Sequence, residues 1–237
     1  MDALVFAAGR GTRLRPHTDD VPKPLLQVAG EPLLAHCLRA AVDYVDRIVL
    51  VVGYRDAEIE ARFGDEFSGI PIEYARQESR EGLAHAVLAA EEYVEGDVLT
   101  INGDNVFEGD LSGLVDRHHE PGVDGTVLLD RVERNEAEAT ARCDLAEDGT
   151  IRGIETAVGE APEAGYIAAG AQTHDGTALL DACRSVERSK NDEYELTEAL
   201  ASLVEQGRYV GVEPDGWHLN VNTPADLDEA RRRFAGE

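Results

Sequence analysis

The sequence predicts an α/β fold built on a doubly wound parallel sheet. Short apolar runs, such as residues 3–8, 47–52 and 97–101, have the length and composition of buried strands. They alternate with segments whose apolar residues recur at helical spacing, which is the order that parallel strands covered by helices require. The chain has 237 residues, 43% of them hydrophobic, which is enough for a core in one large domain or in a domain with a subdomain.

Charge is the strongest compositional signal. The formal net charge is −26, and Lys23 and Lys190 are the only lysines among 22 basic residues. A surface rich in Asp and Glu with few lysines is typical of a cytoplasmic protein from a salt-accumulating halophile, where salt screens the mutual repulsion. An acidic mesophilic enzyme is the alternative. In either case no basic face is available for a nucleic acid partner.

The sequence gives no sign of a membrane or a secreted protein. No apolar run of about 18 residues exists, and no basic segment precedes an apolar one at the N-terminus. Cys37, Cys143 and Cys183 are odd in number and scattered, which favours small core residues over disulfides or metal ligands and fits a reducing cytoplasm. The oligomeric state stays open, a homo-oligomer included.

The segment after the first strand carries the clearest functional signal. Residues 9–16 form a loop with two glycines, a threonine and three arginines, and Lys23 follows between two prolines. Glycines let backbone N–H groups approach an anion, and arginines add forked donors that match phosphate oxygens. Four cations within residues 9–24 of an acidic chain favour a phosphate site over an ordinary connection with surface arginines.

This loop lacks the Gly-Lys-Ser/Thr of a P-loop and the third glycine of a dinucleotide fold. Its pattern Gly-x-Gly-Thr-Arg-Leu-x-Pro, followed by Pro-Lys-Pro-Leu, resembles the signature of the sugar-phosphate nucleotidylyltransferases, and in particular of the archaeal glucose-1-phosphate thymidylyl- and uridylyltransferases. The resemblance implies a Rossmann-like mixed sheet with a small β-rich sugar-binding subdomain. It also implies a reaction: a nucleoside triphosphate and a sugar 1-phosphate give an NDP-sugar and pyrophosphate, with Mg²⁺ as cofactor.

The same resemblance implies roles for the signature residues. Arg13 would hold the leaving β- and γ-phosphates, and Lys23 would neutralise charge that develops on the α-phosphate. The remaining nucleotide contacts implied for this segment are Ala7, Ala8, Gly9, Gly11 and Thr12.

A second nucleotide motif begins at Gln77. In the family a Gln is followed, after a short gap, by Gly-Thr-Ala or Gly-Leu-Ala, which here starts at Gly82 and opens a helix over residues 82–93. An amide offers a donor and an acceptor together, which suits the imide edge of a pyrimidine. Taken alone, Gln77 could equally be a solvated loop residue. We interpret His85 as a helix-face residue and not as a catalyst.

Asp104 follows the apolar strand of residues 97–101. A carboxylate at the carboxyl end of a central strand lies where open α/β sheets bind ligands, and its hard oxygens suit Mg²⁺. The segment resembles the family's Gly-Asp-Asn, in which the Asp binds the metal; Gly103 is then expected at the sugar. A plain turn is the alternative, because these residue types form turns.

Between these motifs the pattern keeps alternating. We expect further helices over residues 34–45, 56–63, 111–119, 178–186, 192–200 and 225–234, and further strands at 72–74, 125–129 and 208–212.

From about residue 133 to 175 the sequence changes to short β-prone pieces with charged turns. The family places its sugar-binding half here, as an insert within the single domain of residues 1–237. Glu155 and Gly170 match family residues that contact the sugar or pack close to it. Ordinary hairpin residues explain both positions almost as well.

Two C-terminal segments complete the resemblance. Tyr194 lies in a Glu-Tyr-x-Leu-Thr stretch that the family has beside the sugar, and Trp217 begins the family's Trp-x-x-Asp-x-Gly-Thr-Pro. The second metal ligand of that motif is Asn220 here, and Asn is also a valid Mg²⁺ ligand. The family's Glu-Lys-Pro, whose Lys contacts the sugar phosphate, reads Glu-Thr-Ala here, with Thr156 in place of the Lys.

These features predict a nucleotidyltransferase that uses UTP or dTTP and glucose 1-phosphate. The alternatives are an N-acetylglucosamine-1-phosphate uridylyltransferase and a regulatory homologue that binds nucleotide or sugar phosphate with weak or no transferase activity.

Overall fold

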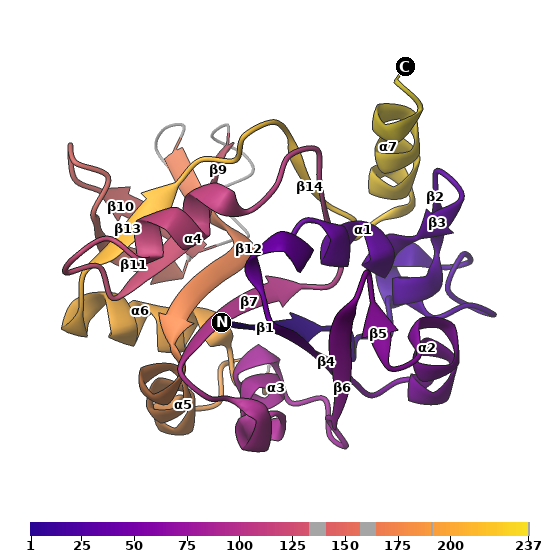
Figure 1. Cartoon of the computed structure of the whole chain (residues 1–237), viewed down its shortest axis with the longest axis horizontal. Helices are drawn as coiled ribbons and strands as arrows, with labels where there is room; N and C mark the ends of the chain where they lie inside the picture. The colour runs from indigo at the N-terminus through magenta and orange to yellow at the C-terminus, as the bar shows by residue number, and fades with distance from the viewer. Residues whose placement is uncertain (133–140, 157–164, 191, 237) are drawn as a thin grey trace.

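A ten-stranded mixed sheet forms the centre of the molecule in the computed structural model, which describes residues 1–132, 141–156, 165–190 and 192–236 (Figure 1). Its middle is parallel: β1 (Asp2–Phe6) lies between β4 (Arg47–Val52) and β7 (Asp97–Asn102), and β6 (Ile70–Arg76) lies outside β4. Leu4, for example, is opposite Val49 on one side and Thr100 on the other. The short strand β5 (Glu66–Phe67) pairs antiparallel with β6 at the edge.

Helices cover both faces of this sheet, so the doubly wound prediction is confirmed. Side chains alternate along β1: Ala3 and Val5 point to one apolar cluster, Leu4 and Phe6 to another. The first cluster includes residues of α1 (Leu33–Arg39), α2 (Asp56–Phe63) and α4 (Ser112–His118). The second includes residues of α3 (Leu83–Ala89), α5 (Gly176–Ser185) and α6 (Leu196–Gln206).

The β-rich part of the chain continues the same sheet. The long strand β12 (Gly165–Asp175) pairs antiparallel with β7 through its second half and with β10 (Ala141–Leu145) through its first half. β9 (Gly125–Val132) runs along the other side of β12, and β13 (Tyr209–Val212) and β11 (Ile151–Thr156) extend the sheet. The segment predicted as an insert therefore joins the main sheet through β12, which pairs with both β7 and β9. Its residues 133–140 and 157–164 lie outside the described part.

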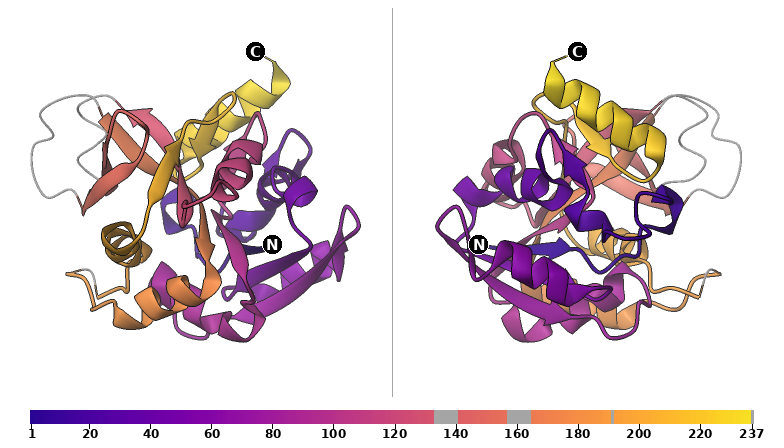
Figure 2. Two further views of the ribbon diagram at one scale, coloured as in Figure 1. Left: turned by 60° about the vertical axis from the view of Figure 1, so that its left-hand side comes forward. Right: turned by 90° about the vertical axis from the view of Figure 1, so that its right-hand side faces the viewer.

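A third, smaller apolar cluster ties the C-terminus to the first loop. It joins α7 (Pro224–Ala235) to the hairpin of β2 (Gln27–Val28) and β3 (Glu31–Pro32), and to the ribbon of β8 (Asn105–Phe107) and β14 (His218–Asn220). In both views of Figure 2, α7 carries the C-terminus along the outside of the molecule. Because Val221 N–H donates to the Asp104 carbonyl at 2.9 Å, the segment after β14 lies beside the end of β7.

Several elements are shorter than the sequence pattern suggests. The helix expected over residues 34–45 ends at Arg39 and resumes as a 3₁₀ turn at Val42–Tyr44; that expected over 82–93 ends at Ala89, before the 3₁₀ turn Glu91–Tyr93. The helix expected from residue 192 begins at Leu196, because residues 192–195 pack against another loop. Two further 3₁₀ turns, Thr12–Leu14 and Lys23–Leu25, lie in the first loop.

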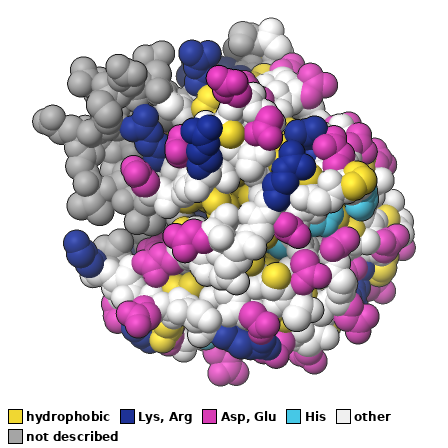
Figure 3. Space-filling model, turned by 90° about the vertical axis from the view of Figure 1, so that its left-hand side faces the viewer, with side chains coloured by type: hydrophobic (Ala, Val, Ile, Leu, Met, Phe, Trp, Pro, Cys, Tyr) yellow, Lys and Arg dark blue, Asp and Glu magenta, His cyan; other side chains and the backbone are white. Residues whose placement is uncertain are grey.

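The three cysteines have the core positions that the sequence predicts. Cys37, Cys143 and Cys183 are all buried. On the face in Figure 3, acidic side chains are scattered widely, and lysines and arginines stand among them singly or in small groups. In the described residues, no helix has the length and apolar character needed to cross a membrane.

Candidate active site

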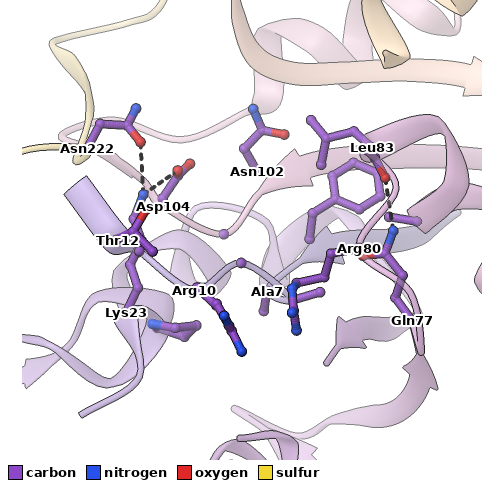
Figure 4. Close-up of a pocket in the computed structure, with 18 of the residues that line it drawn as sticks. Ala7, Arg10, Thr12, Lys23, Gln77, Arg80, Leu83, Asn102, Asp104 and Asn222 are labelled. Carbon is purple, nitrogen blue, oxygen red and sulfur yellow. Dashed lines mark hydrogen bonds and ion pairs between the residues drawn. The ribbon is translucent and has the colours of Figure 1, made fainter. Parts of the chain in front are cut away.

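A pocket of about 510 Å³ opens at the carboxyl ends of the parallel strands (Figure 4). Loops after β1, β6 and β7 form most of its wall, which is where open α/β sheets bind ligands. Eleven of the predicted site residues line it: Ala7, Ala8, Gly9, Gly11, Thr12, Arg13, Lys23, Gln77, Gly82, Gly103 and Asp104.

The loop after β1 wraps around the side chain of Lys23. Gly11 has φ +64°, and a Cβ there would lie 2.8 Å from Lys23 Cβ, so this position requires glycine. Thr18 Oγ1 and Leu14 N–H both donate to the Gly11 carbonyl, at 2.8 and 3.0 Å. Arg10 extends from the same loop over the ring of Tyr54, at 5.2 Å from its centroid. The loop is therefore held rigidly around Lys23, with arginines at its rim.

The three predicted catalytic side chains meet through an asparagine. Lys23 is only 8% exposed; its Nζ donates to Asp104 Oδ2 at 2.6 Å and to Asn222 Oδ1 at 3.0 Å. Arg13 Nη2 donates to the same Asn222 oxygen at 2.8 Å. Two cations thus converge on two oxygens at one end of the pocket (Figure 4). Such a cluster can bind a polyphosphate and stabilise charge that develops on it.

Asp104 also suits a divalent cation. Its second oxygen, Oδ1, is buried and accepts no hydrogen bond from the described residues. These residues contain no group of three or more His, Cys, Asp and Glu side chains that could cage a metal. One free carboxylate oxygen beside an asparagine is a donor set that suits Mg²⁺, which commonly keeps waters and takes phosphate oxygens as its other ligands.

The structure puts the predicted ligand Asn220 near this cluster but not in the pocket wall. Asn220 is exposed on β14, opposite Asn105, one residue before the Val221 contact with Asp104. Asn222, two residues further on, is the asparagine that contacts Lys23 and Arg13. The sequence reasoning missed it because it matched the family Asp at position 220; the metal role of Asn220 stays a prediction.

Gln77 and Gly82 are joined at the other end of the pocket. Gln77 is 4% exposed, and its Nε2 donates to the Gly82 carbonyl at 2.9 Å and lies 3.1 Å from His85 Nδ1. Gly82 has φ +103°, and a Cβ there would lie 2.3 Å from the Tyr194 carbonyl oxygen. Glycine is therefore required for two backbone segments to pack here, which fixes the place of Gln77.

Tyr194 holds this loop through its backbone. Its N–H donates to the Glu81 carbonyl at 2.6 Å, and its carbonyl accepts from Ala84 N–H at 3.0 Å. Its ring lies against Arg188, whose guanidinium also pairs with Glu81 at 2.6 Å. The sugar contact predicted for Tyr194 stays a prediction, since the residue does not line the pocket.

Glycines also bring the neighbouring strand ends close together. A Cβ on Gly103 would lie 2.7 Å from the Phe6 carbonyl oxygen, so the loop after β7 lies directly on the end of β1. Gly170 has φ +76° within β12, and a Cβ there would lie 2.4 Å from Asn105 Nδ2 and 2.9 Å from Asn102 Nδ2. Asn102 lines the pocket, so Gly170 packs directly behind the wall.

Glu155 and Trp217, two predicted sugar contacts, do not line the pocket. Glu155 is exposed on β11, opposite Arg142. Trp217 packs edge-on against Phe234 of α7 and lies under Arg233, at 5.1 and 5.0 Å, which gives it a packing role. Their sugar contacts stay predictions.

The wall also contains residues that the sequence reasoning did not select. Arg80, which Figure 4 labels, comes from the loop after β6, and Glu193 and Glu195 line the pocket from the segment before α6. Burial, and then the charges of Glu193 and Glu198, raise the pKa of Glu195. The rest of this group is Phe6, Pro24, Leu83, Ala86, Asn102 and Asn222.

The glycine-rich loop after β1, the cluster of Arg13 and Lys23 and the Gln77 amide thus lie around one pocket. The chain belongs to the nucleotidyl transferase family, whose model matches residues 2–233.

Among named relatives, the chain is 38% identical to UTP–glucose-1-phosphate uridylyltransferase AglF of Haloferax volcanii, over 100% of this chain and 98% of that protein. It is 32% identical to the bifunctional protein GlmU of Methanococcus maripaludis over 99% of this chain, but it spans only 54% of that longer protein.

Solved structures share the fold. A UDP-glucose pyrophosphorylase complexed with UDP-glucose has a TM-score of 0.86 at 20% identity, covering 99% of this chain and 98% of that one. A putative glucose-1-phosphate thymidylyltransferase from Bacillus anthracis has a TM-score of 0.87 at 24% identity, covering 98% of this chain and 94% of that one. At this identity the likeness confirms the predicted fold class only.

Proposed function

We propose that this chain transfers a nucleotidyl group from UTP or dTTP to glucose 1-phosphate, giving an NDP-glucose and pyrophosphate. The observation that carries the proposal is a hydrogen-bonded cluster at the end of the parallel strands, in which Arg13 and Lys23 share Asn222 and Lys23 also bonds Asp104. The full-length similarity to a glucose-1-phosphate uridylyltransferase supports the choice of sugar and favours UTP.

The proposed chemistry is a single displacement. An oxygen of the sugar phosphate attacks the α-phosphorus, the new O–P bond forms, and the bond to the bridging oxygen of pyrophosphate breaks. The attacking phosphate is already ionised at neutral pH, so no strong general base is needed. Catalysis then consists of positioning and charge neutralisation.

The chain's own residues divide this work. Arg13 and the backbone N–H groups of residues 9–13 hold the leaving β- and γ-phosphates. Lys23, whose stem is fixed against Gly11, brings its ammonium to the α-phosphate. Gln77 at the far end of the pocket holds the base, so that the α-phosphorus lies between base and pyrophosphate sites.

We also propose Mg²⁺ as the cofactor, held by Asp104 with Asn220 or Asn222 supplying an amide oxygen. When bound, Mg²⁺ would supply positive charge to the phosphate oxygens. The buried, unpaired Oδ1 of Asp104 supports this choice of ligand.

The acceptor side departs from the family pattern, because Thr156 replaces the Lys expected at the sugar phosphate. N-acetylglucosamine 1-phosphate is the second candidate acceptor, supported by the likeness to GlmU over 99% of this chain. We propose a cytoplasmic enzyme that works in high salt, which the net charge of −26 supports.

Pyrophosphate release in high potassium chloride tests the proposal. The purified chain is given each of five nucleoside triphosphates with each of several sugar 1-phosphates, and Asp104→Asn serves as the control. We expect release with UTP or dTTP and glucose 1-phosphate. If no pair releases pyrophosphate although UTP binds in equilibrium dialysis, the chain is a binding homologue and the proposal fails.

A further inference from the structure

Four basic side chains line the pocket within the described part of the chain, and the proposed function uses only those of the first loop. Arg10, Arg13 and Lys23 come from residues 9–24, and the fourth is Arg80. Arg80 lies in the loop between β6 and α3, so a different strand end brings it to the pocket (Figure 4). Its charge has no role in binding the nucleotide phosphates as proposed above.

The charge of Arg80 is not neutralised within the described part of the protein. No carboxylate there forms an ion pair with its guanidinium, although the chain has 48 acidic and 22 basic residues. Its neighbour Glu81 is already paired with Arg188 at 2.6 Å, and Arg188 also pairs with Asp192 at 2.7 Å. Arg80 is exposed, and its guanidinium is therefore available to an anionic ligand in the pocket.

The loop that carries Arg80 is fixed against the segment before α6. Two backbone hydrogen bonds of Tyr194, at 2.6 and 3.0 Å, join the two pieces of chain. The same segment brings the side chains of Glu193 and Glu195 to the pocket. After burial, the charge of Glu193 is the next cause that raises the pKa of Glu195, so the two carboxylates repel each other. Without a cation, this part of the wall would repel a phosphate.

The direction of the proposed displacement brings a phosphate to this part of the wall. The attacking and the leaving oxygen lie roughly in line on opposite sides of the α-phosphorus. Since residues 9–13 hold the leaving pyrophosphate, the phosphate of the acceptor lies on the side away from them. Of the basic side chains in the described lining, Arg80 alone lies outside the first loop.

We infer that Arg80 is a substrate-binding residue that holds the phosphate of the sugar 1-phosphate. This inference rests on the proposed function. The planar guanidinium offers two parallel N–H donors to two phosphate oxygens, and its positive charge offsets the charges of Glu193 and Glu195. Arg80 thus supplies the acceptor side with a positive charge that Thr156 cannot provide.

The test is the steady-state kinetics of pyrophosphate release by the full chain in high potassium chloride, with thermal melting to check folding. Arg80→Gln removes the charge and keeps a polar side chain. KM for glucose 1-phosphate should rise about tenfold, the low end for one charge-assisted hydrogen bond because Arg80 is exposed. KM for UTP should stay within about twofold of the wild-type value, because the substitution leaves Gln77 and the first loop intact.

Two further variants separate the charge of Arg80 from a structural role. Arg80→Lys keeps the charge without the fork, so it should recover part of the lost affinity for glucose 1-phosphate. Arg152→Gln is the matched control, since Arg152 is exposed on β11 and does not line the pocket; both KM values should match the wild type. With N-acetylglucosamine 1-phosphate, Arg80→Gln should weaken binding by the same factor, because the contact is to the phosphate that both acceptors share.

An unchanged KM for glucose 1-phosphate in Arg80→Gln overturns the inference. A rise in KM for UTP as large as that for glucose 1-phosphate also overturns it, because it assigns Arg80 to the nucleotide or to the folding of the loop.

Failure of the proposed function has a different signature, namely no pyrophosphate release by the wild type with any pair of substrates. Equilibrium dialysis of labelled glucose 1-phosphate, with the non-reacting α,β-methylene analogue of UTP present, then decides the inference by itself. Binding about tenfold weaker in Arg80→Gln than in the wild type supports it, and equal or absent binding overturns it.

Discussion

Replacing Lys23 by methionine should change metal binding and turnover in opposite directions. Methionine keeps a long unbranched chain against Gly11 but removes the ammonium that bonds Asp104 Oδ2 at 2.6 Å and Asn222 Oδ1 at 3.0 Å. Without nucleotide, that ammonium holds Asp104 Oδ2 and places a positive charge beside the unpaired Asp104 Oδ1 that is proposed to bind Mg²⁺. The substitution therefore frees Asp104 Oδ2, leaves Asn222 Oδ1 with its hydrogen bond from Arg13 alone, and removes a like charge from the proposed metal site.

The magnitudes follow from the kind of bond that is lost. One charge-assisted hydrogen bond contributes about 1.5–3 kcal/mol, so the nucleotide-free variant should bind Mn²⁺ at least about tenfold more tightly. With saturating substrates the same ammonium is missing from the α-phosphate, and kcat should fall by about 10²–10³. Stability should fall by about 2–3 kcal/mol, at the low end for a broken buried pair because the Asp104 side chain is 25% exposed.

Electron paramagnetic resonance of free Mn²⁺ measures the first effect, and single-turnover kinetics with saturating UTP measures the second. Lys190→Met is the matched control, since Lys190 is the only other lysine and is exposed; both quantities should match the wild type. Weaker Mn²⁺ binding in Lys23→Met would refute the view that the ammonium and the metal compete. An unchanged kcat would leave Lys23 as a binding residue only.

Two further predictions concern Asp104 and His174. Asp104→Asn should nearly abolish pyrophosphate release and weaken Mn²⁺ binding in a chain that is still folded by circular dichroism, because it removes the charge of the proposed metal ligand. Its melting temperature should fall, since the buried Lys23 loses its ion pair; wild-type activity would exclude Asp104 from the mechanism. Burial, with a contribution from His118, lowers the pKa of His174 to about 3, below its unfolded value near 6.5. The unfolded chain therefore binds a proton that the folded chain does not, so His174 costs stability as pH falls below about 6.5. Urea unfolding should show that His174→Gln loses about 2 kcal/mol less than the wild type between about pH 7 and pH 5; equal losses would contradict a buried neutral histidine.

The prediction for His174 depends on the contacts of its two ring nitrogens, which only the structure gives. Its Nδ1 lies 3.1 Å from the Tyr209 hydroxyl, and its Nε2 lies 3.1 Å from Gln172 Oε1, which can only accept. The proton is therefore on Nε2, and both ring nitrogens are satisfied without charge. Nothing in the local sequence around His174 indicates this pairing, since Tyr209 is 35 residues away.

The sequence by itself determined the features whose causes are local. Apolar runs such as residues 47–52 favour burial, and the first apolar run breaks at Gly9, where a loop begins whose glycines and arginines suit phosphate. These patterns predicted the doubly wound sheet, and the resemblance to the sugar-phosphate nucleotidylyltransferases indicated eleven of the residues that line the pocket. Helix ends were predicted less well, because tertiary contacts set them: the hydrogen bonds of Tyr194 to the loop before α3 leave the start of α6 at Leu196.

Only the tertiary structure decided which distant side chains meet. Asn222 contacts Lys23 across 199 residues because Val221 bonds the carbonyl of Asp104, and no sequence spacing records that contact. His85 Nδ1 lies 3.1 Å from Gln77 Nε2 because a strand end and a helix start converge, although the sequence pattern shows His85 only as a helix position. Charge and geometry at a site depend on such convergences, whereas the local pattern fixes only which segments can be buried.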